Sequence, residues 1–280
     1  MRLSRFPRGI AILMAVAAVP AESQTPATAP ALTYADVADL ALAAPVAAHV
    51  QVRDAIRLKD ERAVGLEPGM TRFYVEADVL SLIRGARGLP GQVTYLVDLP
   101  NDARGRAPKL RDDTQFILLA ATVAERPGEL RLAAPDAQLP YSPALADQLR
   151  DILHDATRAD APPEITGIGR AFHVPGTLPG ESETQIFLQA ADGRPVSLSI
   201  LRRPGEEPRW AVALSEIVDN AAAAPEPDTL LWYRLACTLP GRLPPQSFAE
   251  ADPSQAAAIE ADYRLVMESL GPCARTRPQR

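Results

Sequence analysis

The stretch that decides the fold is Thr184–Ser215, TQIFLQAADGRPVSLSILRRPGEEPRWAVALS. Apolar and polar side chains alternate in three runs, and the turn signals Asp192–Gly193 and Pro204–Gly205 separate them. Alternation with a period of two is typical of half-buried strands, and Asp-Gly is a strong hairpin signal. The pattern predicts a three-stranded antiparallel meander within residues 184–220, with its apolar face on a core.

A β-rich domain with flanking helices is predicted upstream, over residues 34–158. Five short runs have strand character, and Gly or Pro turns separate them, so we expect a small β-barrel or a curled antiparallel sheet. The run Phe116–Val123 lacks alternation, which indicates burial on both faces. The predicted strands are 50–58, 73–79, 93–97, 116–123 and 130–132.

Two helices flank these strands. Thr33 and Asp36 have the spacing of a capping box, which predicts a helix over 34–44. Ser142 before Pro143 is typical of a helix start, and the apolar stripe that follows predicts a helix over 143–157 that packs on the barrel.

The rest of the chain is predicted to be connectors and a helical hairpin, which gives an α+β fold. The Pro/Gly-rich residues 159–183 are expected to form a connector, and 221–228 a second linker. Residues 229–273 contain two helical patterns, which predict a hairpin of helices. The basic residues 274–280 are expected to be a frayed tail.

Cys237 and Cys273 are the only cysteines. In an exported chain they are expected to form a disulfide that ties the two C-terminal helices together. Their spacing, without a neighbouring histidine pair, does not fit a zinc site.

The N-terminus has the order of a secretory signal peptide. Arg2, Arg5 and Arg8 precede an apolar run over 9–19, which is too short to span a bilayer, and small residues follow. We predict cleavage after Ala21 and a flexible tether over 22–33. The mature chain is then expected in the periplasm, without a transmembrane or lipid anchor.

Charge argues against nucleic acid as a partner. Removing the three arginines of residues 1–21 leaves 26 of the 29 basic residues against 35 acidic ones, a net charge of about −9. Nucleic-acid binding needs a concentrated positive surface, which this composition does not favour. The sequence suggests no cofactor.

One catalytic candidate is present. Ser182 has His173 upstream, as a serine hydrolase would require of a nucleophile and its base. The Gly-x-Ser-x-Gly elbow is missing, and Glu181 and Glu183 on both sides of Ser182 would oppose negative charge on its oxygen. A polar loop that leads into the meander is the alternative interpretation.

A binding loop is the second candidate. His173, Gly176, Gly180 and Glu181 lie in a stretch rich in Gly and Pro, and such loops form binding sites on rigid scaffolds or serve as plain connectors. The three histidines are far apart in the sequence and show no metal-ligand spacing. Asp98, Asp102, Asp112 and Asp113 are interleaved with arginines, which favours ion pairs over a cation site, so no metal site is predicted.

Four segments resemble uncharacterised exported proteins of alphaproteobacteria. The segments are Phe73–Asp78, Tyr95–Pro100, Ala171–Gly176 and Leu231–Cys237, and the resemblance covers most of the mature chain. It implies export. It implies no activity, and no functional residue is carried over from it.

Three functions stay open at this point. The leading hypothesis is a non-enzymatic periplasmic module that binds an envelope protein or a small ligand. The second is a periplasmic hydrolase with a site near Ser182 and His173. The third is a scaffold that supports an envelope assembly.

Overall fold

The computed structural model describes residues 31–214 and 223–277. The predicted signal peptide, its cleavage after Ala21 and most of the predicted tether lie outside these ranges, as do parts of the predicted meander and second linker. The described chain is α+β, as predicted, with two sheets and four α-helices. Within it, no helix is long and apolar enough to cross a membrane.

The first sheet is a closed, barrel-like structure. Its strands are hydrogen-bonded in the order β1-β2-β3-β5-β4-β6, and β1 also pairs with β4, which closes the sheet. The prediction from five strand-like runs is therefore confirmed, with the short strand β6 in addition. The strands are β1 Val46–Arg57, β2 Met70–Arg84, β3 Gln92–Pro100, β4 Gln115–Thr122, β5 Glu129–Leu132 and β6 Gln138–Pro140.

Strand β4 contributes to two cores, as its lack of alternation predicted. Phe116 and Leu118 belong to the cluster that fills the barrel, whereas Ile117 and Leu119 belong to a second cluster outside it. Because successive side chains of a strand point to opposite faces, a strand with a core on each side must be apolar throughout.

The second core also takes in the helices. The helix α1 (Tyr34–Ala43) begins with the predicted capping box, and α2 (Pro143–Thr157) begins with the Ser142 cap. Leu149 and Ile152 of α2 are buried in this cluster together with Val37 and Leu40 of α1. The helix α2 therefore packs on α1 as well as on the outer side of the barrel.

The second sheet has four antiparallel strands in the order β10-β9-β8-β7. The predicted meander supplies three of them: β8 (Ser182–Ala190), β9 (Val196–Arg202) and β10 (Arg209–Ala213). The fourth, β7 (Ile165–Pro175), falls inside the predicted connector, so that prediction was wrong for these residues. Glycines and a register shift between Ile168 and Ala171 break the alternation of β7, which hid the strand.

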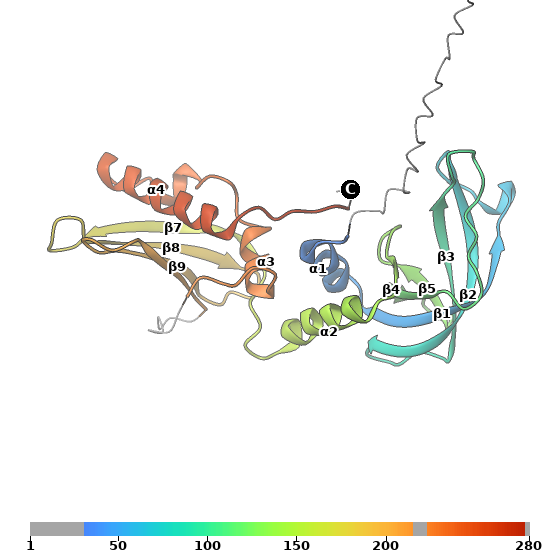
Figure 1. Ribbon diagram of the computed structural model, residues 1–280. Helices are drawn as coiled ribbons and strands as arrows, with labels where there is room; N and C mark the ends of the chain where they lie inside the picture. Colours follow the sequence, from blue (N-terminus) through green and yellow to red (C-terminus); the bar gives the residue numbers. More distant parts are fainter. Residues whose placement is uncertain (1–30, 215–222, 278–280) are drawn as a thin grey trace, which may run out of the picture. The chain divides into compact units, whose positions relative to one another are not determined.

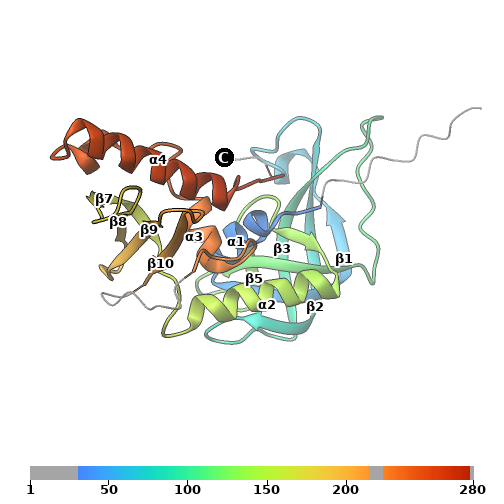
Figure 2. The same ribbon diagram turned by 60° about the vertical axis from the view of Figure 1, so that its left-hand side comes forward.

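The C-terminal part contains α3 (Leu230–Ala236) and α4 (Pro253–Leu270). The predicted disulfide is present, with Cys237 and Cys273 joined at an S–S distance of 2.05 Å. Figures 1 and 2 both show α4 along one face of the second sheet. Two short 3₁₀ helices, Asp60–Arg62 and Pro245–Phe248, complete the described elements.

The prediction of a frayed tail was wrong for residues 274–277. Thr276 and Arg277 bind Asp36 at the start of α1, and Arg275 binds Asp39 on the same helix. Basic composition suggested a solvated end, but acidic partners far away in the sequence hold it in place.

Candidate functional site: a groove beside strand β3

A groove runs between β3 and the segment that connects β5 to β6. Leu96–Pro100 form one wall, and Arg131–Asp136 form the other. A cavity of about 610 Å³ occupies one part of it, and an adjoining hollow of about 380 Å³ shares Val97, Asp98 and Ala133 with this cavity. We call this feature the β3 groove. Its size is within the range of ordinary ligand sites.

The groove exists because β3 is longer than its neighbour. Strand β3 has nine residues, and β5 has four. On the side that faces β5, β3 pairs only at Thr94 and Tyr95 within the described ranges. On its other side it pairs with β2 along its whole length. The part from Leu96 to Pro100 therefore runs past β5, as Figure 1 shows.

The backbone of β3 presents polar groups to this groove. The N–H of Thr94 donates to the carbonyl of Gly128, at 2.8 Å, so even-numbered residues of β3 point their N–H and C=O toward the β5 side. Alternation along the strand then directs the N–H and C=O of Asp98 into the groove. Backbone groups of this kind on a strand edge are a template for another extended chain.

Ion pairs fix most of the charged side chains of the groove. Arg72 donates from Nε and Nη2 to the carboxylate of Asp98, both at 2.7 Å. The pKa of Arg72 is raised by its hydrogen bond to Asp98, against an opposing effect of burial. Two-point pairs of this geometry hold both side chains in one orientation.

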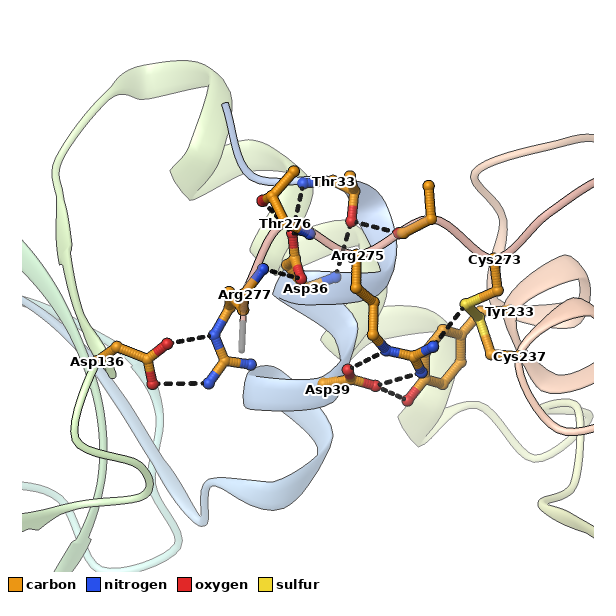
Figure 3. Close-up of polar contacts among 11 residues, drawn as sticks. Thr33, Asp36, Asp39, Asp136, Tyr233, Cys237, Cys273, Arg275, Thr276 and Arg277 are labelled. Atoms are coloured by element: carbon orange, nitrogen blue, oxygen red, sulfur yellow. Dashed lines mark hydrogen bonds and ion pairs between the residues drawn. A yellow bond between two sulfur atoms is a disulfide. The ribbon is translucent and has the colours of Figure 1, made fainter. Parts of the chain in front are cut away.

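The C-terminal segment closes one end of the groove. Arg277 donates from Nε and Nη2 to the two oxygens of Asp136, both at 2.8 Å, and all these groups are shown in Figure 3. Asp39 also lines this end, and it accepts hydrogen bonds from Nε of Arg275 at 2.7 Å and from the hydroxyl of Tyr233 at 2.6 Å. Burial, followed by the bond to Asp39, raises the pKa of Tyr233. Apart from Arg131, which has no ion pair within the described residues, the charged side chains of the walls are therefore paired.

Asp36, at the start of α1, holds the C-terminal segment by hydrogen bonds. Its carboxylate accepts hydrogen bonds from the backbone of Thr33, Thr276 and Arg277 and from the Thr276 hydroxyl. Burial raises the pKa of Asp36, but these hydrogen bonds outweigh burial and hold the pKa well below its ordinary value. The carboxylate therefore stays ionised, and it keeps the segment next to the groove.

The sequence-predicted candidate His173 lies elsewhere, in the second sheet. Its Nδ1 is 2.8 Å from Oγ1 of Thr184, and the Thr184 hydroxyl donates to Oδ2 of Asp262. A hydroxyl has one proton, so Nδ1 of His173 must be the donor in the first bond. Asp262 is almost fully buried, and it also accepts from Nε of Arg202 at 2.7 Å.

This arrangement does not have the order of a hydrolytic triad. In such a triad the histidine lies between the nucleophile and the carboxylate. Here the Thr184 hydroxyl lies between His173 and Asp262, and Thr184 is fully buried. Ser182 is two residues away, in register with Pro175 and Arg202, and the structure brings His173 to Thr184 instead.

The predicted binding loop is a hairpin turn between β7 and β8. The carboxylate of Glu181 accepts hydrogen bonds from the backbone N–H of Thr177 and Leu178, and the N–H of Gly176 donates to the Glu181 carbonyl at 2.7 Å. A side chain at Gly176 would collide with Glu181, and Gly180 has a φ of 87°. These residues build the turn itself, which accounts for them without a ligand.

The other histidines are also engaged or exposed. His49 stacks on Tyr141, with ring centroids 3.7 Å apart, and contacts Gln115 through Nε2 at 3.0 Å. His154 lies on the surface beside Asp155. Among the described residues, no three His, Cys, Asp or Glu side chains converge as metal ligands would.

Comparisons with known proteins do not assign the chain to a family. No family model matches the sequence. No curated protein matches it either. Function therefore has to be inferred from the residues and their geometry.

Sequence reasoning missed the β3 groove. The strand-like run that includes Tyr95–Pro100 is visibly longer than Leu130–Leu132, and that difference was the available signal for an uncovered strand edge. The residues that close the groove, Asp136 and Arg277, are 141 positions apart and carry no common pattern.

Proposed function

We propose that this chain is an exported, non-enzymatic binding module that takes an extended segment of an envelope partner into the β3 groove. One observation carries the proposal: within the described ranges, the stretch Leu96–Pro100 has no partner strand on the β5 side, and the backbone groups of Asp98 face a groove of sufficient size. Adding a strand to a free edge satisfies such groups, and pockets beside the edge select side chains.

The composition of the walls supports a peptide as the occupant. Leu96, Leu99 and Ala134 offer apolar surface, and the charged groups other than Arg131 are already neutralised in pairs. Among the described wall residues, a cationic ligand would find no unpaired counter-ion, and an anionic ligand would find only the exposed Arg131. A neutral, extended backbone with small or apolar side chains fits this chemistry better.

Export to the periplasm is part of the same proposal. The disulfide between Cys237 and Cys273 agrees with an oxidising compartment, and the N-terminal pattern agrees with a secretory signal. A hydrolase with Ser182 and His173 has less support, because His173 is committed to the buried Thr184.

Selection of peptides from a random phage-displayed library on the disulfide-intact chain tests the groove. Ala133 is exposed in its wall, so Ala133→Trp should fill the groove without disturbing the core. Ala191, exposed in the turn between β8 and β9, provides the control Ala191→Trp. Circular dichroism checks that both variants are folded.

We expect selected peptides to bind the wild type and Ala191→Trp alike, and to bind Ala133→Trp at least tenfold more weakly. Hydrogen exchange of the Asp98 amide should slow when a peptide is bound, because that N–H becomes a donor to the added strand. Peptides that bind Ala133→Trp as well as the wild type, or a failure to select any peptide, would overturn the proposal.

A further inference from the structure

The β3 groove is closed at both ends. Arg277 and Asp136 close one end. At the other end, which we call the narrow end, β3 and β5 are still joined, and Tyr95 and Leu130 are their last paired residues. Beyond that pair the two strands diverge, because β5 stays in register with β4. An internal segment of a partner would have to turn out of such a groove twice, whereas a chain terminus turns out only once.

One charged side chain at the narrow end has no ion-pair partner among the described residues. Arg131 directly follows Leu130, its side chain is exposed, and it lines the hollow of about 380 Å³. The other charged residues of the walls are paired, as Arg72 is with Asp98. A carboxylate would therefore find a free guanidinium at the narrow end, whereas an ammonium group would find no free carboxylate in the described walls.

The backbone supplies a second donor at the narrow end. The carbonyl of Gly128 accepts from the N–H of Thr94 on β3, at 2.8 Å, and the N–H of Ala133 donates to Leu119 of β4, at 2.9 Å. Alternation between these two positions directs the N–H of Leu132 toward β3. Because the β3–β5 ladder has already ended there, this N–H faces the groove. A backbone N–H beside a guanidinium is a typical setting for a bound carboxylate.

We propose that the β3 groove binds the free carboxyl terminus of its partner, with the terminal carboxylate held by the Arg131 guanidinium and the Leu132 N–H. This inference rests on the function proposed above, and it names the part of the partner that enters the groove. Closure at both ends favours a chain terminus, and the free charge of Arg131 favours the carboxyl end. The bound segment stays neutral along its length and carries one charge at its end.

The position of Arg131 also sets the direction of the segment. A carboxyl terminus at the narrow end requires a segment that runs antiparallel to β3, from Pro100 toward Leu96. Its last residue then lies opposite Leu96, whose carbonyl accepts the N–H of that residue, and an earlier residue exchanges both backbone hydrogen bonds with Asp98. A segment parallel to β3 would instead bring its amino terminus to Arg131. Like charges oppose that direction.

The format of peptide display tests the requirement for a terminus. Two random phage libraries are selected on the disulfide-intact chain, one with free carboxyl ends and one with free amino ends. We expect binders from the library with free carboxyl ends. Each selected peptide is then synthesised as the free acid and as the C-terminal amide, and fluorescence anisotropy measures both. Amidation should weaken binding by about tenfold or more, because it removes the charge that Arg131 holds.

Variants of Arg131 identify the group that holds the carboxylate. Arg131→Gln should bind the free acid about tenfold more weakly or worse, and amidation should weaken its remaining binding by less than in the wild type. Arg131→Lys keeps the charge and should retain most of the affinity. Arg242→Gln, at an exposed arginine between α3 and the second 3₁₀ helix, is the control and should bind as the wild type does. Circular dichroism checks that all three variants are folded.

The outcomes separate this inference from the function on which it rests. Equal binding of acid and amide by the wild type would overturn the inference, and so would equal binding of the acid by the wild type and Arg131→Gln. If such peptides still lose binding in Ala133→Trp, peptide binding in the β3 groove stands without the terminal carboxylate. Peptides that bind Ala133→Trp as well as the wild type would overturn the proposed function itself.

Discussion

Thr276 and Asp36 are 240 positions apart in the sequence, and two hydrogen bonds join them. The backbone N–H and the hydroxyl of Thr276 both donate to Oδ2 of Asp36, at 3.0 and 2.6 Å. Asp36 is also the residue that closes the capping box of α1 with Thr33. The start of α1 and the end of the chain therefore stabilise each other.

Truncation tests that dependence. A chain that ends at Ala274 loses the groups that bind Asp36, Asp39 and Asp136. Because the carboxylates of Asp36 and Asp39 then lose several of their hydrogen bonds, we expect the free energy of unfolding to fall by roughly 3–5 kcal/mol, measured in urea. A chain that ends at Arg277 keeps all of these contacts and is the control. Equal stability of the two truncated chains would contradict the role of this segment.

Asp36→Asn should change how stability depends on pH. The pKa of Asp36 is lower in the folded chain than its unfolded value of about 3.9, so its contribution is present above that pH and is lost as the pH falls toward the folded pKa. At pH 7 we expect the variant to be less stable by roughly 1–3 kcal/mol. The difference should shrink at pH 3. Urea unfolding at pH 7 and pH 3 measures this stability difference, and Asp112→Asn, at an exposed position, is the control. A difference that does not change with pH would show that the ionised Asp36 carboxylate is not its cause.

Asp262 and Arg202 should show a large coupling energy in the free energy of unfolding. Asp262 is almost fully buried, so Arg202→Met leaves a buried charge with one partner fewer, and we expect a loss of roughly 3–5 kcal/mol. Asp262→Asn in addition should recover part of that loss. A double-mutant cycle of unfolding free energies measures the coupling, and Arg203→Met, at an exposed neighbour, is the control. Additive losses would indicate that the ion pair contributes little.

The disulfide should stabilise the C-terminal part of the chain. Cys237 and Cys273 close a loop with a sequence separation of 36, for which chain entropy predicts roughly 3–4 kcal/mol. The double variant Cys237→Ser/Cys273→Ser should lose about this much in denaturant unfolding. Thiol labelling of the native wild type should be negative; two reactive thiols would refute the bond in the natural protein.

The mature protein is expected to begin at Glu22. Val19 and Ala21 supply the small residues that signal peptidase requires before the cut. N-terminal sequencing of the protein from the periplasmic fraction of its source measures the start. An intact Met1, or recovery only from the cytoplasm, would show that the export prediction is wrong.

Local patterns predicted most elements of the fold. The caps at Thr33 and Ser142 gave the helix starts, and the alternation within 184–215 gave β8, β9 and β10. The failures were the short strand β6, strand β7 and the C-terminal segment. Glycines and a register shift concealed the periodicity of β7, and the segment lacks a periodicity of its own.

The candidate sites were harder to predict, for a physical reason. Ser182 and His173 were candidates because serine and histidine are the nucleophile and base of serine hydrolases. In the structure, His173 instead contacts Thr184, which is hydrogen-bonded to Asp262. The β3 groove depends on how far β3 extends beyond β5, and strand length differences become a groove only when the strands are paired.

The sequence by itself determined the α+β class, the helix caps, the cysteine pair and the predicted export signal, because each depends on residues close together or on residue type. Only the tertiary structure decided that Arg277 meets Asp136 and that β3 keeps an uncovered edge. These relations arise from strand register and from long-range ion pairs. Neither can be inferred from local periodicity.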